Sequence, residues 1–208
     1  MNPLPLGLLY PAQTGAMEQL QAAIRHMIAV SDMEMEGLLG NCRIRTFKRQ
    51  ENLSLPDYTP NEIFFINRGI IRVIVTDNKG TEHTIHFAME NQFIADYSGF
   101  ILRQPSMYTL QAIEETETVV LPRASIDWGY QNLAQGDKLG RLIAEFYFIY
   151  QDNRIKNLYA RTPKERYDSI EEVFPDIHNR APQHMIASYL GITPVHLSRL
   201  KRQQKRKT

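Results

Sequence analysis

The 208-residue sequence contains a single cysteine, Cys42. One thiol cannot form an internal disulfide, ligate an iron–sulfur cluster or build a zinc knuckle, so these three kinds of site are excluded. Long hydrophobic runs are lacking too, and none approaches the roughly 20 apolar residues that a membrane-spanning helix needs. Residues 1–16 contain three prolines and lack the basic start of a signal peptide. We therefore expect a flexible leader on a cytoplasmic protein with no membrane partner.

Acidic residues are absent after Asp176, although this stretch contains seven Lys and Arg residues. The rest of the chain carries a net charge of −6, which is the total of +1 less the 7 charges of the basic end. Clustered basic side chains neutralise phosphates and make binding salt-dependent. The charge distribution therefore favours a nucleic-acid partner for the C-terminal end.

Two helical patterns follow each other within this basic end. Ile186 and Leu190 are four residues apart and share one helix face, and Leu197 and Leu200 share a face three residues apart. The spacing predicts two short helices that pack against each other through these apolar pairs. An ordinary αα-hairpin is the alternative interpretation.

The turn between the two helices has the chemistry of a helix-turn-helix motif. Gly191 can adopt a left-handed backbone and end the first helix. Thr193 is a suitable N-cap, and Pro194 is suited to the first position of the second helix. We expect this second helix to face double-stranded DNA with Thr193, Pro194, Val195, His196, Ser198, Arg199, Arg202 and Lys205.

The N-terminal two thirds of the chain change from helical to strand periodicity. Residues 17–30 have helical spacing, and a capping box at Ser31 opens a second helix that ends near Gly40. Alternating and β-branched runs then follow, separated by turns such as Asp77–Gly80. Short strands in this arrangement are typical of an antiparallel sandwich, roll or barrel. The predicted strands are 42–48, 63–66, 70–76, 82–88, 92–95, 107–113 and 117–121.

A long helix is predicted for residues 134–160. Its apolar residues are spaced three and four apart, as on a coiled-coil seam. We expect this helix to form a homodimer, and the alternative is a long helix that packs on the roll of its own chain. Thr162 then caps a shorter helix that runs through Phe174. The seam residues are Leu139, Leu142, Phe146, Ile149 and Asn153.

Three motifs carry a resemblance to a known family: EIFFINRGIIRVIV at 62–75, PKERY at 163–167 and IASYLGITPVHLSRLKR at 186–202. The chain resembles the Crp/Fnr family of bacterial transcription regulators. The resemblance implies an α+β fold, with a cyclic-nucleotide-binding-like β-roll at 17–133, a dimerisation helix at 134–160 and a winged helix-turn-helix domain at 161–208. It also implies a homodimer that reads a pseudo-palindromic operator through helix 194–203, with RNA polymerase as a further candidate partner.

The resemblance also assigns roles within the DNA-reading helix. Arg199 matches the family's guanine-reading arginine, whose fork can donate to O6 and N7 of the base. Pro194 and Val195 stand where the family has its other base readers, so the operator should differ from the one that those members read. Any wing hairpin would have to lie before the helix-turn-helix, near residues 174–182.

The effector site departs from the family pattern. Asp96 supplies a carboxylate where cyclic-nucleotide-binding members hold the ribose, but Pro105 stands where they have a phosphate-binding arginine. A buried phosphate without a cation is costly, although Arg103 could substitute. We predict no response to cyclic nucleotides, and the aromatic side chains either line a site for a neutral effector or fill the roll. The candidate pocket comprises Phe93, Asp96, Tyr97, Arg103, Ser106 and Tyr108.

Two other functions remain as alternatives. His83, His86 and Glu90 would be the ligands of a metal-dependent, cupin-like β-roll enzyme. Residues three apart on a strand point to opposite faces, however, so the two histidines cannot easily share a metal. The other alternative is a dimeric small-ligand sensor that does not bind DNA. We expect no catalytic residues, no metal and no cofactor, and therefore a protein that is not an enzyme.

Overall fold

The structure is a computed structural model that describes residues 15–205, with the backbone alone for residues 204 and 205. Residues 1–14, most of the predicted leader, and residues 206–208 lie outside the described part. Helix α1 (Ala16–Met27) already includes the last predicted leader residue. Helix α2 (Asp32–Leu39) begins at the predicted capping box, in which Ser31 accepts from the backbone N–H of Glu34.

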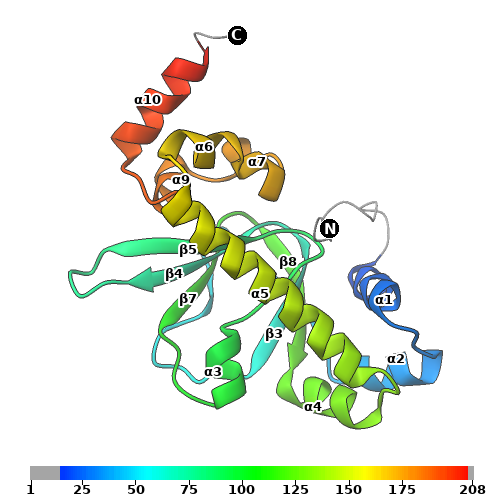
Figure 1. Cartoon of the computed structure of the whole chain (residues 1–208). Helices are drawn as coiled ribbons and strands as arrows, with labels where there is room; N and C mark the ends of the chain where they lie inside the picture. Colours follow the sequence, from blue (N-terminus) through cyan, green and yellow to red (C-terminus); the bar gives the residue numbers. More distant parts are fainter. Residues whose placement is uncertain (1–14, 206–208) are drawn as a thin grey trace.

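Eight antiparallel strands form a roll of two four-stranded sheets (Figure 1). The sheet orders are β1-β8-β3-β6 and β2-β7-β4-β5. All seven predicted strands are present, whereas the short β2 was not predicted. The bounds are β1 Arg43–Phe47, β2 Asn52–Ser54, β3 Glu62–Arg68, β4 Ile71–Thr76, β5 Glu82–Ala88, β6 Phe93–Ile94, β7 Tyr108–Ala112 and β8 Thr116–Pro122.

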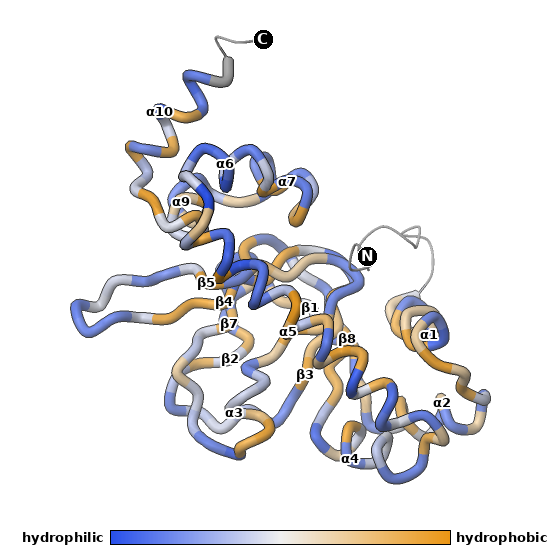
Figure 2. The backbone as a smooth tube through the Cα atoms, viewed as in Figure 1, coloured by the Kyte–Doolittle hydropathy of each residue, from blue (hydrophilic) through white to orange (hydrophobic). Residues whose placement is uncertain are grey.

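The first sheet buries apolar side chains on both of its faces. Phe64 and Val120 point into the roll, and Phe65 and Val119 point outward against α1. This arrangement follows from the period of two along a strand. Figure 2 shows the hydrophobic segments gathered along these strands and the inner side of α1. Residues of α1 and α2 therefore complete an outer layer on the roll. The sequence predicted these two helices but not where they pack.

Two further helices lie within the range predicted as roll. Helix α3 (Tyr97–Leu102) follows β6, and helix α4 (Arg123–Asn132) follows β8 directly. Pro122 is the last residue of β8 and also the N-cap of α4. The proline was expected to end the strand, and its fixed φ angle also suits the start of a helix.

Helix α5 (Gly136–Ala160) runs across the roll toward the C-terminal helices (Figure 1). It begins two residues later than predicted. Helix α4 ends at Asn132, and its C-cap Leu133 donates its N–H to Gly129 O at 3.1 Å. Gly136 is packed against this turn, and a Cβ there would lie 2.3 Å from Gly129 O. No helix within residues 15–205 is long and apolar enough to cross a membrane.

Five short helices follow α5, and two predictions for this part were wrong. The helix expected through Phe174 is broken at Ser169, whose Oγ donates to the carbonyl of Glu165. The segment 174–182, where a wing hairpin was placed, contains a helical turn, and the described residues after Pro122 contain no strand. The helices are α6 Pro163–Asp168, α7 Ile170–Val173, α8 Ile177–Arg180, α9 Gln183–Tyr189 and α10 Pro194–Lys205.

The C-terminal helices share one hydrophobic core with the roll. Ile70 and Phe87 of the roll are fully buried in the same cluster as Phe174, Met185 and Tyr189. Helix α9 also lies beside β5, where the N–H of Thr84 donates to Ser188 Oγ at 2.8 Å. The DNA-binding candidate is thus packed on the roll in this structure.

Candidate nucleic-acid interface

The turn between α9 and α10 has the predicted geometry. Gly191 adopts φ = +66°, in the left-handed region that favours glycine. Thr193 Oγ1 accepts from the N–H of His196 at 3.2 Å, and Pro194 is the first residue of α10. The buried Ala187 accepts from the N–H of Ile192 at 3.0 Å, which closes the turn. The local sequence therefore forms the helix-turn-helix motif that was predicted.

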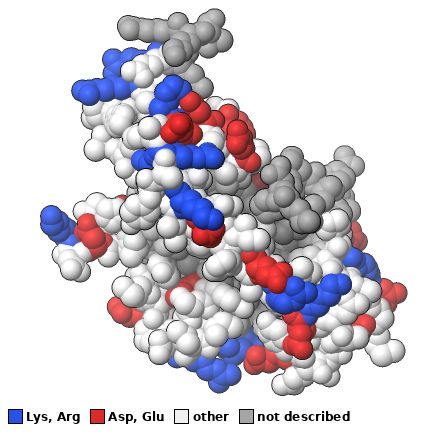
Figure 3. All heavy atoms as spheres, viewed as in Figure 1, with Lys and Arg blue, Asp and Glu red and all other residues white. Residues whose placement is uncertain are grey.

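Helix α10 has one buried face and one exposed face. Leu197 and Leu200 are 1% and 8% exposed and pack into the shared core. The opposite face contains Arg199 and no acidic side chain, and Figure 3 shows Lys and Arg atoms gathered over α10. The side chain of Lys205, also predicted to face DNA, lies outside the described part. The other predicted residues are all exposed: Thr193, Pro194, Val195, His196, Ser198, Arg199 and Arg202.

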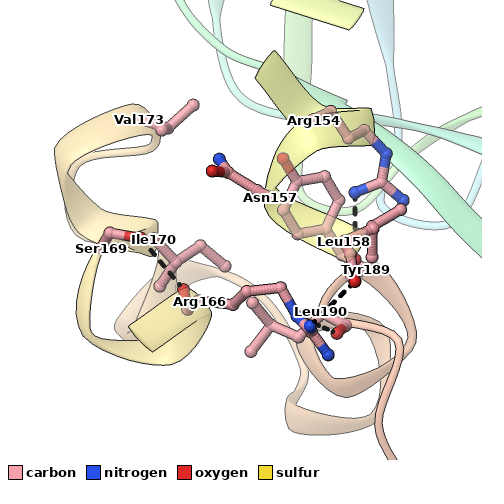
Figure 4. A pocket seen from close by; sticks show the side chains of 9 residues that line it. All are labelled: Arg154, Asn157, Leu158, Arg166, Ser169, Ile170, Val173, Tyr189 and Leu190. Atoms are coloured by element: carbon pink, nitrogen blue, oxygen red, sulfur yellow. Dashed lines mark hydrogen bonds between the residues drawn. The ribbon is translucent and has the colours of Figure 1, made fainter. Parts of the chain in front are cut away.

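Two arginines fix the position of α9 relative to the end of α5 (Figure 4). Arg166, from the PKERY motif, donates to Leu190 O at 3.0 Å and to Leu158 O at 3.2 Å. Arg154 donates to Tyr189 O at 3.1 Å, and its guanidinium lies 4.1 Å from the centre of the Tyr189 ring. Burial, followed by the charge of Arg154, lowers the pKa of Arg166.

These contacts were not predicted from the sequence. The carbonyls that the two arginines reach belong to the ends of helices. Cations are favourable at helix C-termini, where the last carbonyls lack partners. Arg166 and Arg154 thus couple the orientation of the helix-turn-helix to α5.

The six candidate effector residues do not share one cavity. Asp96 is the N-cap of α3 and accepts from Gly99 N at 3.0 Å and from Ser98 Oγ at 2.9 Å. Ser106 is buried, and its Oγ accepts from the N–H of Tyr108 at 2.9 Å. Both side chains therefore accept hydrogen bonds from neighbouring backbone N–H groups. Their assignment to an effector remains a prediction.

The other candidate residues lie on different surfaces. Phe93 packs on Phe65 with ring centres 5.1 Å apart, and it lines a small hollow beneath α5 together with Tyr97. Arg103 is exposed and caps the end of α3 with φ = +53°. Asp96 lines a larger cavity at the end of the roll, which Phe93 does not reach. The sequence pattern thus placed together side chains that the fold separates.

Aromatic side chains fill the space between α5 and β5. His86 lies 4.4 Å from Tyr150 and 6.0 Å from Tyr147, measured between ring centres. Tyr147 donates to the carbonyl of Phe93, and the hydroxyl groups of Tyr150 and Tyr189 are 3.0 Å apart. Burial, and then the charge of Arg154, lowers the pKa of His86 to about 3. This histidine is therefore neutral in the folded protein at physiological pH.

The residues of the metal-site alternative are separated in the structure. His83 is exposed on the β4–β5 hairpin, with Nε2 3.0 Å from Asp77 Oδ2, whereas His86 is buried beneath α5. Glu90 forms an ion pair with Arg180. Within residues 15–205 there is no group of three His, Cys, Asp or Glu side chains arranged to hold a metal ion. The predicted separation of the two histidines is confirmed.

Comparison with known proteins identifies a matching domain and solved structures with a similar fold. Residues 44–132 match the model of the cyclic nucleotide-binding domain. FixK2 from Bradyrhizobium japonicum is 16% identical, with a TM-score of 0.68 over 80% of this chain and 85% of that one. CLP of Xanthomonas campestris, described as a c-di-GMP responsive global regulator, is 10% identical, with a TM-score of 0.65 over 85% and 93% of the two chains.

A third solved structure, a Crp/Fnr transcriptional regulator from Eubacterium rectale, is 13% identical, with a TM-score of 0.65 over 86% and 85% of the two chains. No curated protein sequence matches the chain significantly. The roll that matches this domain model is joined by a long helix to a C-terminal helix-turn-helix. The chain has the fold of the Crp/Fnr transcription regulators.

Proposed function

We propose that this protein is a sequence-specific DNA-binding transcription regulator. The observation that carries the proposal is the division of α10 into a buried apolar face and an exposed basic face. A helix held by its turn and by Leu197 and Leu200 can enter the major groove with Arg199 directed at base edges. The basic residues near the C-terminus supply the phosphate contacts that position it.

The regulator acts as a homodimer through α5. Phe146 is half-buried, Ile149 is 43% exposed and Asn153 is exposed, so this part of the predicted seam is available to a second copy. Leu139 and Leu142 pack partly against the apolar side chains between the first sheet and α1. Contacts within a single chain therefore explain the first half of the predicted seam. Two parallel copies would present two α10 helices to successive half-sites of a pseudo-palindrome.

A second apolar stripe on α5 was not predicted. It consists of Phe148, Ile155 and Tyr159, which are 73%, 56% and 89% exposed. Their spacing of seven and four residues places them on one helix face. The dimer proposed here buries the Phe146 and Ile149 side of α5, and this second stripe allows a matched test of that choice.

The regulator does not use a cyclic nucleotide as its effector. Tyr147, Tyr150 and His86 fill the space beneath α5 with aromatic rings, and His86 is neutral. Asp96 accepts from the N–H of Gly99 at the start of α3, and Pro105 provides no cation for a cyclic phosphate in the segment that follows β6. RNA polymerase is the proposed partner once the protein is bound at a promoter.

Selection of genomic fragments by the purified full-length protein, followed by sequencing, tests the proposal. The proposed function predicts enrichment of a pseudo-palindromic motif, with half-site centres about one helical turn apart. Binding should weaken steeply between about 50 and 200 mM salt because phosphate contacts release counterions. Recovery of random fragments without a shared motif would contradict sequence-specific recognition, and a single unpaired half-site would contradict the dimer.

A further inference from the structure

A cavity lined by β1, β2 and the segment that follows β2 opens at the end of the roll, and none of its lining residues belongs to α5. It has a volume of about 620 Å³ and lies between the inner faces of the two sheets. None of its lining residues belongs to α5 or β5, so it is separate from the hollow beneath the long helix. Its size falls within the range of sites that bind small molecules.

Two arginines point into this cavity from β1. Arg43, Arg45 and Phe47 alternate along the strand and share one face, and Phe47 is fully buried in the inner core. Arg43 lies opposite Val120, another inner-core residue, which confirms the direction of this face. The two arginines therefore lie on the cavity side of β1, where their side chains remain 52% and 43% exposed at the cavity mouth.

Each arginine is held in place but retains donors. Arg43 Nη2 donates to Glu62 Oε1, and Arg45 Nη2 donates to Glu51 Oε1 at 3.2 Å. The Arg45 guanidinium also lies over the Phe47 ring at 4.2 Å. A guanidinium has five N–H donors, and within residues 15–205 each of these two makes one side-chain hydrogen bond. The remaining donors can bind an anionic group bidentately.

The carboxylates around the cavity are already engaged or lie in solvent. Glu62 pairs with Arg43, and Asp96 accepts from the start of α3. Asp57 is exposed at the rim. The free N–H donors of Arg43 and Arg45 are thus the groups to which a ligand can still bind.

The rest of the lining is suited to an apolar ligand body with a polar group. Phe64 and Leu110 are buried and form apolar walls on the two sheets. Ser54 lies opposite Leu110 in the register, and its buried Oγ has no hydrogen-bond partner in the described part of the chain. Because this oxygen is fully buried, the contacts to a ligand body come from the two apolar walls.

We propose that this cavity binds a small organic carboxylate with an apolar body. Arg43 and Arg45 bind the carboxylate, and Phe64 and Leu110 contact the body. A ligand in this position bridges β1 and β2, the edge strands of the two sheets. The proposal is independent of DNA binding.

Calorimetric titration of the full-length protein tests this site with two probes, 3-phenylpropionate and its uncharged amide. The carboxylate should bind with one site per chain, and the amide should bind at least roughly tenfold more weakly. The double variant Arg43→Gln/Arg45→Gln should lose roughly tenfold or more of the carboxylate affinity. Arg45→Lys keeps the charge but not the fork, and it should fall between the two.

Arg68→Gln is the matched control, because Arg68 is exposed, pairs with Glu115 and lies outside the cavity. It should bind 3-phenylpropionate like the wild type. Hydrogen exchange in β2 should slow when the probe binds, and this slowing should be lost in the double variant. Equal binding of the two probes, unchanged affinity in the double variant, or no binding of the carboxylate up to about 10 mM would overturn the proposal.

Discussion

Arg180 in α8 is bound by two carboxylates of the roll, Glu90 and Glu114. Its Nη1 lies 3.1 Å from Glu90 Oε2, and its Nε lies 3.2 Å from Glu114 Oε1. Glu90 also accepts from the N–H of Gly69 at 2.8 Å. Burial raises the pKa of Glu90, but the hydrogen bonds from Arg180 and Gly69 outweigh it, so the pKa lies below its usual value. These contacts link the roll to the helix-turn-helix domain.

Loss of this link should loosen the C-terminal helices from the roll. The charges are about a quarter exposed, so Arg180→Gln should lower the free energy of unfolding by about 1–3 kcal/mol, less than for a fully buried pair. Backbone amides of α9 and β5 should exchange faster, because the Thr84–Ser188 hydrogen bond joins these elements. Chemical denaturation and hydrogen exchange measure both effects.

Arg25→Gln is the control for that experiment, since the Arg25–Asp32 pair is exposed and distant from α8. It should change the stability by less than about 0.5 kcal/mol and leave α9 protected. Equal effects of Arg25→Gln and Arg180→Gln would show that the contacts of Arg180 do not hold the two parts together.

Acidification should destabilise the protein through His86. Its pKa is about 3 in the folded state against 6.5 for the free side chain. Between these two values the unfolded chain binds a proton that the folded chain excludes, so the free energy of unfolding falls as pH falls. The loss from this residue should be about 2 kcal/mol between pH 7.5 and 5.

Melting curves of the wild type and of His86→Phe across this pH range isolate the effect. The phenylalanine keeps an aromatic ring against Tyr147 and Tyr150 but does not titrate. The variant should show a shallower fall of stability with acid. Parallel curves for the two proteins would show that His86 takes up its proton without loss of the fold.

The dimer proposal predicts which face of α5 joins the two copies. Phe146→Asp with Ile149→Asp would place like charges across the two-fold axis and should give monomers. Phe148→Asp with Ile155→Asp, on the second stripe, should leave the dimer intact. Light scattering at micromolar concentration distinguishes these outcomes, and a monomeric wild type would contradict the proposal outright.

The sequence predicted the elements whose signals are local. The turn at Gly191 and Thr193, the capping box at Ser31 and the N-cap at Thr162 depend on backbone chemistry within a few residues, and all three are confirmed. Strand periodicity identified the seven longer strands for the same reason. The break at Ser169 was missed because the local pattern continues through it.

Contacts between distant segments could not be predicted from such signals. Nothing in the sequence around Arg180 indicates that Glu90 and Glu114 bind it, and the carbonyl partners of Arg166 carry no side-chain signature. The candidate effector residues were grouped because they are close in sequence. The fold then directs Phe93 toward α5 and Asp96 toward the end of the roll.

Cyclic AMP and cyclic GMP should not bind to the protein. The rings of Tyr147, Tyr150 and His86 occupy the space beneath α5, and Pro105 provides no cation for the phosphate. Calorimetric titration with each nucleotide should give no heat of binding at micromolar concentrations. Micromolar binding of either nucleotide, especially if Arg103→Ala abolishes it, would restore an effector role for the segment that follows β6.

Deletion of residues 205–207 should weaken binding to all DNA sequences about equally. These three residues are basic and should contact phosphates, which carry no direct sequence information. The slope of log affinity against log salt should therefore become shallower. A truncated protein with a changed sequence preference would show that this end reads bases instead.

Operator discrimination by Arg199→Ala tests the central claim most directly. Arg199 is exposed on α10, and the proposed contact is a pair of hydrogen bonds to a guanine. Affinities of the wild type and the variant should be measured for the selected operator, for operators changed at each base pair, and for random DNA at one salt concentration. The variant should lose about 1–3 kcal/mol on the operator and lose discrimination at one base pair in each half-site, with random DNA little affected. An unchanged preference between operator and random DNA would contradict the account.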